Sequence, residues 1–458
     1  MSRRIARTTL LSAAFALAFT ASASVAVAAE KTGKAADSKK TVKSAKESKA
    51  KDSAKSAKAP LVVEPVVVTL SHRLDDVRAK NLQTLIDAYN SREKAVQVVL
   101  ARRNGSEAPS LLNLATRAEA TELGQRGAFR PLAAVLSEAK QSAPDNQSLA
   151  PEVRSADTDG KGKLTALPLA YSAPVLFWNK ALFRKAGLDP ENPPRTWQEV
   201  QDAAGKLRDV ADSDCPYTTS WPAWVHIDNV SARNGGTVMQ GNELTINGFV
   251  QIKHIAKLSS WYKSKYFVTF GHEDQADSHF AKGECGMLTS NSDIYATLRV
   301  TPGLDVGVTQ LPYYDDVYGT PRPALIDGSS LWVGAGHKRN EYEQAARFVS
   351  YLMGNDAQVE LVRGVGGLPL TTAAARNAGN KLDKRELAAV QVASNGARGV
   401  SKGEEARTLA ANPAVLKIVD EELDAVWADR KPAKEALDTA VSRGNRILRT
   451  GGKVRLAM

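Results

Sequence analysis

Long apolar runs are missing from this chain, and their absence excludes a protein that spans a membrane. The one candidate, Leu10 to Phe19, is shorter than the roughly 20 apolar residues that a helix needs to cross a bilayer. Three arginines precede it within the first seven residues, and small residues follow it as far as Ala29. This three-part arrangement is typical of a secretory signal over residues 1–29. We therefore expect a soluble protein that is exported to the periplasm.

Cysteine is nearly absent as well. Only Cys215 and Cys285 occur. In an oxidising compartment these two residues could form a disulfide, and they could equally remain two buried free thiols. No cysteine lies near Ala29, so the signal region offers no residue to lipidate.

Signatures of catalysis are also absent. The chain has no nucleophile elbow, no His-Glu-x-x-His motif and no cysteine beside a helper residue. The glycine-rich stretches at 364–367 and 451–453 lack the strand and spacing of a nucleotide-binding loop. We therefore expect no enzymatic activity and no cofactor.

One segment has the composition of a metal site. It contains His272, Glu273, Asp274, Asp277 and His279. The spacing matches no known ligand signature, so an ordinary polar start of a helix is the preferred interpretation. We predict no metal.

Residues 30–59 have a composition of their own, almost only Lys, Ala, Ser, Asp and Glu, with ten lysines against four acidic residues. Their few apolar side chains are too small and too sparse to build a core, so we expect a disordered tail that acts as a solvated spacer. Contact with anionic lipid or cell wall is the alternative. The tail and the signal arginines account for most of the formal charge of +11, so the charge does not indicate a nucleic-acid partner.

The remaining residues, 60–458, exceed what one hydrophobic core usually supports. Strand-like and helix-like patterns alternate along them, for instance Val66 to Leu70, then Asp75 to Tyr89, then Val96 to Leu100. The run from Thr196 to Glu199 has the form of a capping box that opens a helix. This alternation predicts α/β layers in two lobes.

Four stretches of the chain carry a family resemblance. They are Ala173 to Pro190 with Pro193 to Glu199, Trp221 to Trp224 with Asn229 to Ala232, Asp327 to Val333, and Ile418 to Leu423 with Ala436 to Asn445. In this order and spacing they resemble the family 1 extracellular solute-binding proteins and, within that family, the members that bind glycerol phosphate. The resemblance covers about Val66 to Gly451.

The resemblance implies a fold and a division into domains. The fold is an α/β, two-lobed periplasmic binding protein, a Venus flytrap like that of maltose-binding protein, with strands crossing between the lobes. Lobe 1 would take residues 60–171 and 328–376, and lobe 2 residues 172–327 and 377–458. The ligand would lie in the cleft between the lobes, near the crossings.

The resemblance also implies a function. The chain would be the substrate-binding subunit of an ABC importer, a monomer that works with permease and ATPase subunits. Its small-molecule ligand would be glycerol 3-phosphate, a glycerophosphodiester or a related polyol or sugar. A degenerate binding protein that acts as a sensor or structural partner is an alternative. A periplasmic hydrolase is a weaker one, because the family positions that could hold catalytic carboxylates carry other residues.

Residues of the ligand site follow from the same resemblance, position by position. A cleft serine falls on Ser172, a tryptophan on Trp221, a second serine on Asn291 and a glycine on Gly328. Such groups suit a phosphorylated polyol, which needs hydrogen-bond donors and an apolar wall. Further candidates are Thr116, Ser292, Ser329, Gly367, Arg407 and Lys417.

Three family residues of the site are replaced in this chain. The arginine that pairs with phosphate falls on Leu416, with Lys417 beside it and Arg407 upstream as substitutes. The cleft glutamate falls on Thr116 and a cleft tyrosine on Gly367. Losing a charged partner of a buried anion costs about 2–5 kcal/mol of binding free energy. The sequence therefore predicts weak binding of glycerol 3-phosphate and a preference for a neutral or diester ligand.

Overall fold

The computed structural model describes residues 64–104, 108–126, 128–154, 157–159, 161–317, 319, 321–399, 408–409 and 411–450. Residues 62–458 form one compact unit. The expected signal, the expected tail and Arg407 lie outside the described residues. Within the described part, no helix is both long and apolar enough to cross a membrane.

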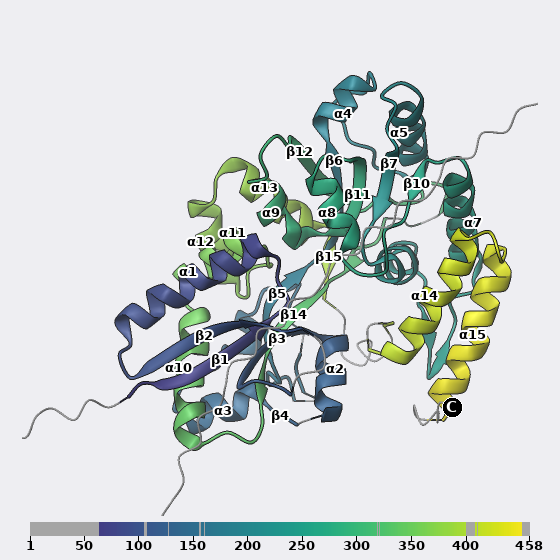
Figure 1. The fold of residues 1–458 in the computed structure, drawn as a ribbon. Coiled ribbons are helices and arrows are strands. Elements are labelled where there is room, and N and C mark those ends of the chain that lie inside the picture. The colour runs from purple at the N-terminus through teal and green to yellow at the C-terminus, as the bar shows by residue number, and fades with distance from the viewer. Residues whose placement is uncertain are drawn as a thin grey trace, which may run out of the picture. The chain divides into compact units, whose positions relative to one another are not determined.

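The first sheet has six strands (Figure 1). Their order is β2-β1-β3-β14-β4, and β5 pairs with β14 as well. β1 runs parallel to β2 and β3, whereas β14 runs antiparallel to β3, β4 and β5. The strands are β1 (Val66–His72), β2 (Val96–Arg102), β3 (Leu112–Thr116), β4 (Phe129–Arg130), β5 (Leu167–Ser172) and β14 (Asp327–Gly334).

Helices pack on this sheet through apolar faces. α1 (Asp76–Arg92) begins after Asp75, whose side chain accepts a hydrogen bond from the Arg78 amide, and it buries Leu82 and Ile86 completely. Their spacing of four residues puts both on one side of the helix, as the sequence pattern predicted. The other helices of this core are α2 (Arg117–Arg126), α3 (Leu132–Glu138), α10 (Arg339–Leu352) and α11 (Asn355–Gly364).

The second sheet has five strands in the order β10-β7-β11-β6-β12. They are β6 (Pro174–Asn179), β7 (Cys215–Thr219), β10 (Phe267–Val268), β11 (Cys285–Asn291) and β12 (Val306–Gln310). All six residues of β6 are buried, as are the five of β7, which is typical of central strands covered on both faces. The two central strands therefore lie inside the second core.

One helix beside the second sheet begins with the predicted capping box. Thr196 Oγ1 accepts from the Glu199 amide at 3.1 Å, and Glu199 accepts from the Thr196 amide at 3.0 Å, at the start of α5 (Trp197–Asp209). The other elements are α4 (Lys180–Lys185), a π-helix η2 (Trp224–Asn229), α6 (Val230–Arg233), α7 (Phe249–Lys263), α8 (Gln275–Ala281), η3 (Ser292–Ile294), α9 (Tyr295–Leu298), α14 (Pro413–Trp427) and α15 (Ala433–Arg449). In Figure 1, α14 and α15 run side by side next to α7.

A disulfide joins two neighbouring strands of the second sheet. Cys215 and Cys285 are register partners at the starts of β7 and β11, and their sulfur atoms are bonded. The alternative of two free thiols is therefore wrong. The bond closes a loop with a sequence separation of 70 residues, which restricts the unfolded chain.

The chain passes between the two sheets at two places. β5 ends at Ser172 in the first sheet, and β6 begins at Pro174 in the second. The return begins at β13 (Ala324–Leu325), which pairs with β15 (Ala397–Arg398), and β14 starts at Asp327. The resemblance implied crossings near Ala170 to Pro174 and near Leu325 to Gly328, and the sheets change within both stretches.

Five further elements lie outside the two main sheets. They are α12 (Thr372–Lys381), α13 (Lys384–Asn395), the hairpin of β8 (Met239–Gln240) and β9 (Glu243–Leu244), and the short helix η1 (Asn146–Ser148). α12 contacts α11, whereas α13 contacts β12 and η3 of the second sheet's side.

Candidate ligand-binding site

Two predicted ligand residues, Ser172 and Gly328, lie where the sheets meet. Ser172 ends β5, is fully buried and donates to the Asp327 carbonyl at 3.4 Å. Gly328 pairs with Tyr171, and a Cβ atom at Gly328 would lie 2.2 Å from the Ala170 carbonyl oxygen. No larger residue fits at Gly328, since β5 and β14 approach too closely there.

Trp221 lies two residues after the end of β7 and is partly exposed. Its φ of +53° is uncommon for a bulky residue. A hydrogen bond from its amide to the Glu273 carbonyl, 2.9 Å long, helps to hold this conformation. The preceding residue, Ser220, donates to Asp277 at 2.6 Å, and burial raises the pKa of Asp277 to about 7. An aromatic ring and a titratable carboxyl are thus positioned by the same loop.

A fully buried polar chain underlies this loop. Tyr314 Oη contacts His254 Nδ1 at 2.9 Å, His254 Nε2 contacts His226 Nδ1 at 2.8 Å, and His226 Nε2 contacts Tyr217 Oη at 3.2 Å. Tyr217 then reaches Thr289 at 2.7 Å on the neighbouring strand. Burial lowers the pKa of His226 to about 3 and lowers that of His254 strongly, so both imidazoles are neutral.

Asn291 and Ser292 lie at the end of β11 and differ in what they contact. Ser292 Oγ accepts from the Ala173 amide at 3.1 Å, so its hydroxyl fastens the crossing between the sheets. Asn291 pairs with Pro174 in the sheet, and its side-chain oxygen is buried with no hydrogen-bond partner among the described residues. Of the two, Asn291 retains an acceptor for a further group.

On the first sheet's side, Thr116 and Ser329 are register partners in β3 and β14. The Thr116 hydroxyl accepts from the Glu119 amide at 3.2 Å, and Glu119 Oε2 accepts from the Thr116 amide at 2.8 Å. This is a capping box at the start of α2. The carboxylate that the family has at position 116 is therefore absent there, but Glu119 supplies one a turn later.

Glu119 connects to two arginines that the sequence prediction missed. Its Oε1 lies 2.9 Å from Arg73 Nη1 and 3.1 Å from Arg103 Nη2. Arg73 also reaches across to Glu273, with 3.2 Å between Nη2 and Oε2. The Thr-x-x-Glu spacing could have indicated Glu119, but no local pattern indicates Arg73, whose partner Glu273 is 200 residues away.

A second ion pair links the same segment to the second sheet's side. Arg78 Nη1 lies 2.6 Å from Asp293 in η3, and Arg78 Nε lies 2.7 Å from Asp75. Thr297 of α9 donates to Asp75 at 3.0 Å. We call the contacts of Arg73 and Arg78 with Glu273 and Asp293 the junction.

Of the two substitutes expected for the missing arginine, Arg407 lies outside the described residues, and Lys417 makes none of the contacts of the junction. Leu416 of α14 packs partly buried against the second core, and Lys417 is exposed. One turn after Leu416, Asp420 lies 3.7 Å from His272 Nδ1, and Asp424 lies 3.0 Å from His272 Nε2. Burial, reinforced by the carboxylates of Asp424 and Glu273, raises the pKa of Asp420 to about 7. α14 therefore presents two carboxyl groups to His272, one and two turns after Leu416.

The segment with a metal-like composition is divided among separate partners. Glu273 contacts Arg73, His272 contacts Asp420, and Asp277 contacts Ser220. His279 pairs with Glu284 and stacks on Phe270. Among the described residues, no group of three or more His, Cys, Asp or Glu is arranged to hold a metal ion.

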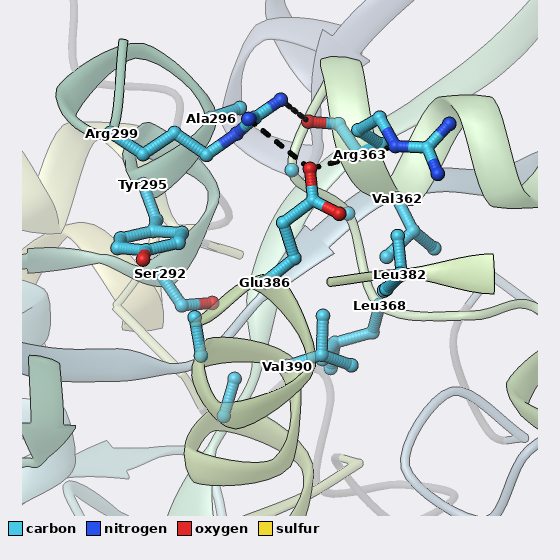
Figure 2. Close-up of a pocket in the computed structure, with 14 residues that line it drawn as sticks. Ser292, Tyr295, Ala296, Arg299, Val362, Arg363, Leu368, Leu382, Glu386 and Val390 are labelled. Carbon is cyan, nitrogen blue, oxygen red and sulfur yellow. Dashed lines mark hydrogen bonds and ion pairs between the residues drawn. The ribbon is translucent and has the colours of Figure 1, made fainter. Parts of the chain in front are cut away.

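Two other candidates, Ser292 and Gly367, line a small cavity of about 30 Å³ between α9, α11 and α13. Figure 2 shows the Glu386 carboxylate between the guanidinium groups of Arg299 and Arg363. Glu386 Oε1 lies 3.1 Å from Arg299 Nη1 and 3.5 Å from Arg363 Nε. The volume suits one or two water molecules, not a polyol. This cavity is therefore separate from the cluster of Arg73, Trp221 and Glu273.

Comparisons with known proteins agree with the resemblance seen in the sequence. A family described as bacterial extracellular solute-binding protein matches residues 84–388. The sn-glycerol-3-phosphate-binding periplasmic protein of Pectobacterium atrosepticum is 34% identical over 406 residues, which cover 82% of this chain and 90% of the relative. The corresponding Salmonella typhimurium protein is 36% identical over 365 residues, covering 77% and 82%.

Solved structures confirm the predicted fold class. A maltose-bound protein of T. maritima has a TM-score of 0.68 at 17% identity and covers 83% of this chain and 100% of its own. A Mycobacterium tuberculosis protein in complex with glycerophosphocholine has a TM-score of 0.68 at 16% identity, covering 84% and 99%. The fold is that of the maltose-binding-protein-like periplasmic binding proteins. The chain therefore belongs to the family of bacterial extracellular solute-binding proteins.

Proposed function

We propose that this protein is the periplasmic substrate-binding subunit of an ABC importer and that it captures a glycerophosphodiester or a related glycerol phosphate. The observation that carries the proposal is the convergence at the junction. There Arg73 and Glu119 from the first sheet's side meet Glu273, beside Trp221, from the second. A cation, an aromatic ring and hydrogen-bonding groups from two bodies suit a small phosphorylated polyol.

The names of the relatives support this ligand class. The curated relatives are named for sn-glycerol 3-phosphate, and one structural neighbour was solved with glycerophosphocholine. A phosphodiester carries a single negative charge, whereas a phosphomonoester carries about two at neutral pH. Glu119 and Glu273 pair with Arg73, and Asp277 accepts from Ser220, the residue before Trp221, so a singly charged ligand meets less repulsion from carboxylates than a doubly charged one. We therefore propose a glycerophosphodiester as the preferred ligand, ahead of glycerol 3-phosphate.

The same proposal divides the chain into two lobes that would enclose the ligand. Lobe 1 comprises residues 60–171 and 328–376, and lobe 2 residues 172–327 and 377–458. In support, one core cluster draws mainly on residues 68–173 and 326–370, with Ala393 added, and a small one on residues 115–123, whereas the other two draw on 175–314 and 409–440. The protein acts as a soluble monomer that delivers its ligand to permease and ATPase subunits. It releases that ligand unchanged.

Thermal unfolding with a panel of ligands tests the proposal. Glycerophosphocholine, glycerol 3-phosphate, glycerol and maltose are each added to the mature protein. A ligand at 100 times its dissociation constant stabilises the folded state by about 2.7 kcal/mol. We expect the largest increase in melting temperature with the diester and a smaller one with the monoester. A response to maltose alone, or to no compound, would refute the proposed ligand class.

A further inference from the structure

Three arginines lie at or next to the junction, and their exposure separates them. The side chains of Arg103 and Arg78 are 4% and 11% exposed, whereas that of Arg73 is 49% exposed. Arg103 is enclosed behind Glu119, and Arg78 is held by Asp75 and Asp293. A ligand that enters from solvent can reach only the Arg73 guanidinium without displacing packed side chains.

The two carboxylates that hold Arg73 are not equivalent. Glu119 is 20% exposed and is also held by the Thr116 amide and by Arg103, so it forms a fixed support. The Glu273 side chain is 45% exposed and contacts Arg73 through a single oxygen at 3.2 Å. An ion pair this exposed contributes only about 0–1 kcal/mol. The Glu273 carboxylate can therefore be exchanged for another anion at small cost.

The position of Arg73 suits a ligand contact. It directly follows β1, at the carboxyl end of a parallel strand, where ligands of open α/β sheets bind. Its partner Glu273 holds the Trp221 amide through its carbonyl. The guanidinium has five N–H donors in a planar fork that matches two phosphate oxygens.

We propose that Arg73 binds the anionic group of the ligand, and that this group takes the place of the Glu273 carboxylate on the guanidinium. Arg73 thereby performs, from the opposite side of the site, the task that Leu416 cannot perform. This inference rests on the proposed function and adds the residue that recognises the anion. Because Glu119 stays beside Arg73, a singly charged phosphodiester is preferred over a doubly charged phosphomonoester.

The test compares four variants of the full mature protein by isothermal titration calorimetry with glycerophosphocholine and with glycerol 3-phosphate. The variants are Arg73→Met, Arg73→Lys, Glu273→Gln and the control Arg184→Met. Arg184 pairs with Asp305 and has a side chain 51% exposed, so it matches Arg73 as a half-exposed arginine in an ion pair. Circular dichroism melts verify that every variant is folded.

We expect Arg73→Met to weaken binding of the tighter ligand by at least about tenfold, because a hydrogen-bonded charge contact is lost. Arg73→Lys should recover part of this loss, since it keeps a point charge without the fork. Glu273→Gln should tighten binding by up to about fivefold, because the competing carboxylate is removed. Arg184→Met should bind like the unaltered protein.

Two results would overturn the assignment while leaving the proposed function intact. The first is binding by Arg73→Met within twofold of the unaltered protein. The second is a loss in Glu273→Gln as large as that in Arg73→Met, which would mean that Glu273 contacts the ligand and Arg73 only positions it. Binding of neither probe by the unaltered protein would refute the ligand class and this inference together.

Discussion

The segment around the start of α1 makes two ion pairs with the second sheet's side, and they differ in burial. Arg78 and Asp293 have side chains 11% and 8% exposed, whereas those of Arg73 and Glu273 are 49% and 45% exposed. Burial makes a broken pair costly, because the remaining charge has no solvent around it. Breaking an exposed pair costs little free energy, because water solvates both charges. One short segment thus combines a permanent attachment with a contact that a ligand can replace.

The largest effect is expected from breaking the buried pair. Arg78→Met should lower the free energy of unfolding by about 3–5 kcal/mol, since Asp293 would be left buried without its cation. Urea denaturation monitored by tryptophan fluorescence measures this change. Arg78→Met combined with Asp293→Asn should recover part of the loss. A loss below about 1 kcal/mol in the single variant would contradict the distinction between the two pairs.

Substitution of Glu119, which supports Arg73, should lower the free energy of unfolding by an intermediate amount. Glu119→Gln removes the charge that neutralises Arg103, whose side chain is 4% exposed. We expect the free energy of unfolding to fall by about 1–3 kcal/mol. Glu138→Gln is the matched control, because Glu138 is exposed and pairs with the partly exposed Arg130. Equal effects of the two substitutions in urea denaturation would show that Glu119 is not a fixed support.

The affinity for an anionic ligand should depend on pH through Asp277. Burial raises the pKa of Asp277 to about 7, with Asp274 adding to the shift and Ser220 and Arg78 opposing it. Asp277 is therefore neutral below this pH and negative above it. Affinity for glycerophosphocholine should fall roughly two- to fivefold from pH 6 to pH 8, because the carboxylate repels the anion.

The diester is the right probe for this effect, because its phosphate does not titrate between pH 6 and pH 8, whereas a phosphomonoester has a second pKa near 6. Calorimetry at several pH values measures the dependence. Asp277→Asn should reduce this dependence, and Asp277→Asn combined with Asp420→Asn should remove it, because burial raises the pKa of Asp420 to about 7 as well. An undiminished dependence in Asp277→Asn would contradict the role given to Asp277.

The smallest change in stability is expected from the exposed pair itself. Arg73→Met should lower the free energy of unfolding by no more than about 1 kcal/mol, even though its effect on ligand affinity is large. Arg78→Met, by contrast, should mainly reduce stability. Urea denaturation of Arg73→Met and Arg78→Met under the same conditions measures the difference in their free energies of unfolding. A loss from Arg73→Met that equals the loss from Arg78→Met would make both pairs structural.

Much of the candidate site follows from the sequence where local spacing or family position carries it. Thr196 and Glu199 cap α5 as their spacing predicted. The Trp221 amide donates to the Glu273 carbonyl beside the junction, whereas Lys417 is exposed on α14. Arg73 could not be predicted from the sequence, because its partners Glu119 and Glu273 are 46 and 200 residues away.

The sequence by itself determined the α/β alternation through its short-range periodicity. It determined the family through the order of four motif stretches, and the places where the chain changes sheets were expected only from that resemblance. Only the tertiary structure decided that Cys215 bonds to Cys285, that Glu119 pairs with Arg73 and Arg103, and that Arg73 is more exposed than Arg78 and Arg103. The physical reason is distance along the chain. Pairing and burial arise when remote segments pack together, and no local pattern records which charge remains accessible to solvent.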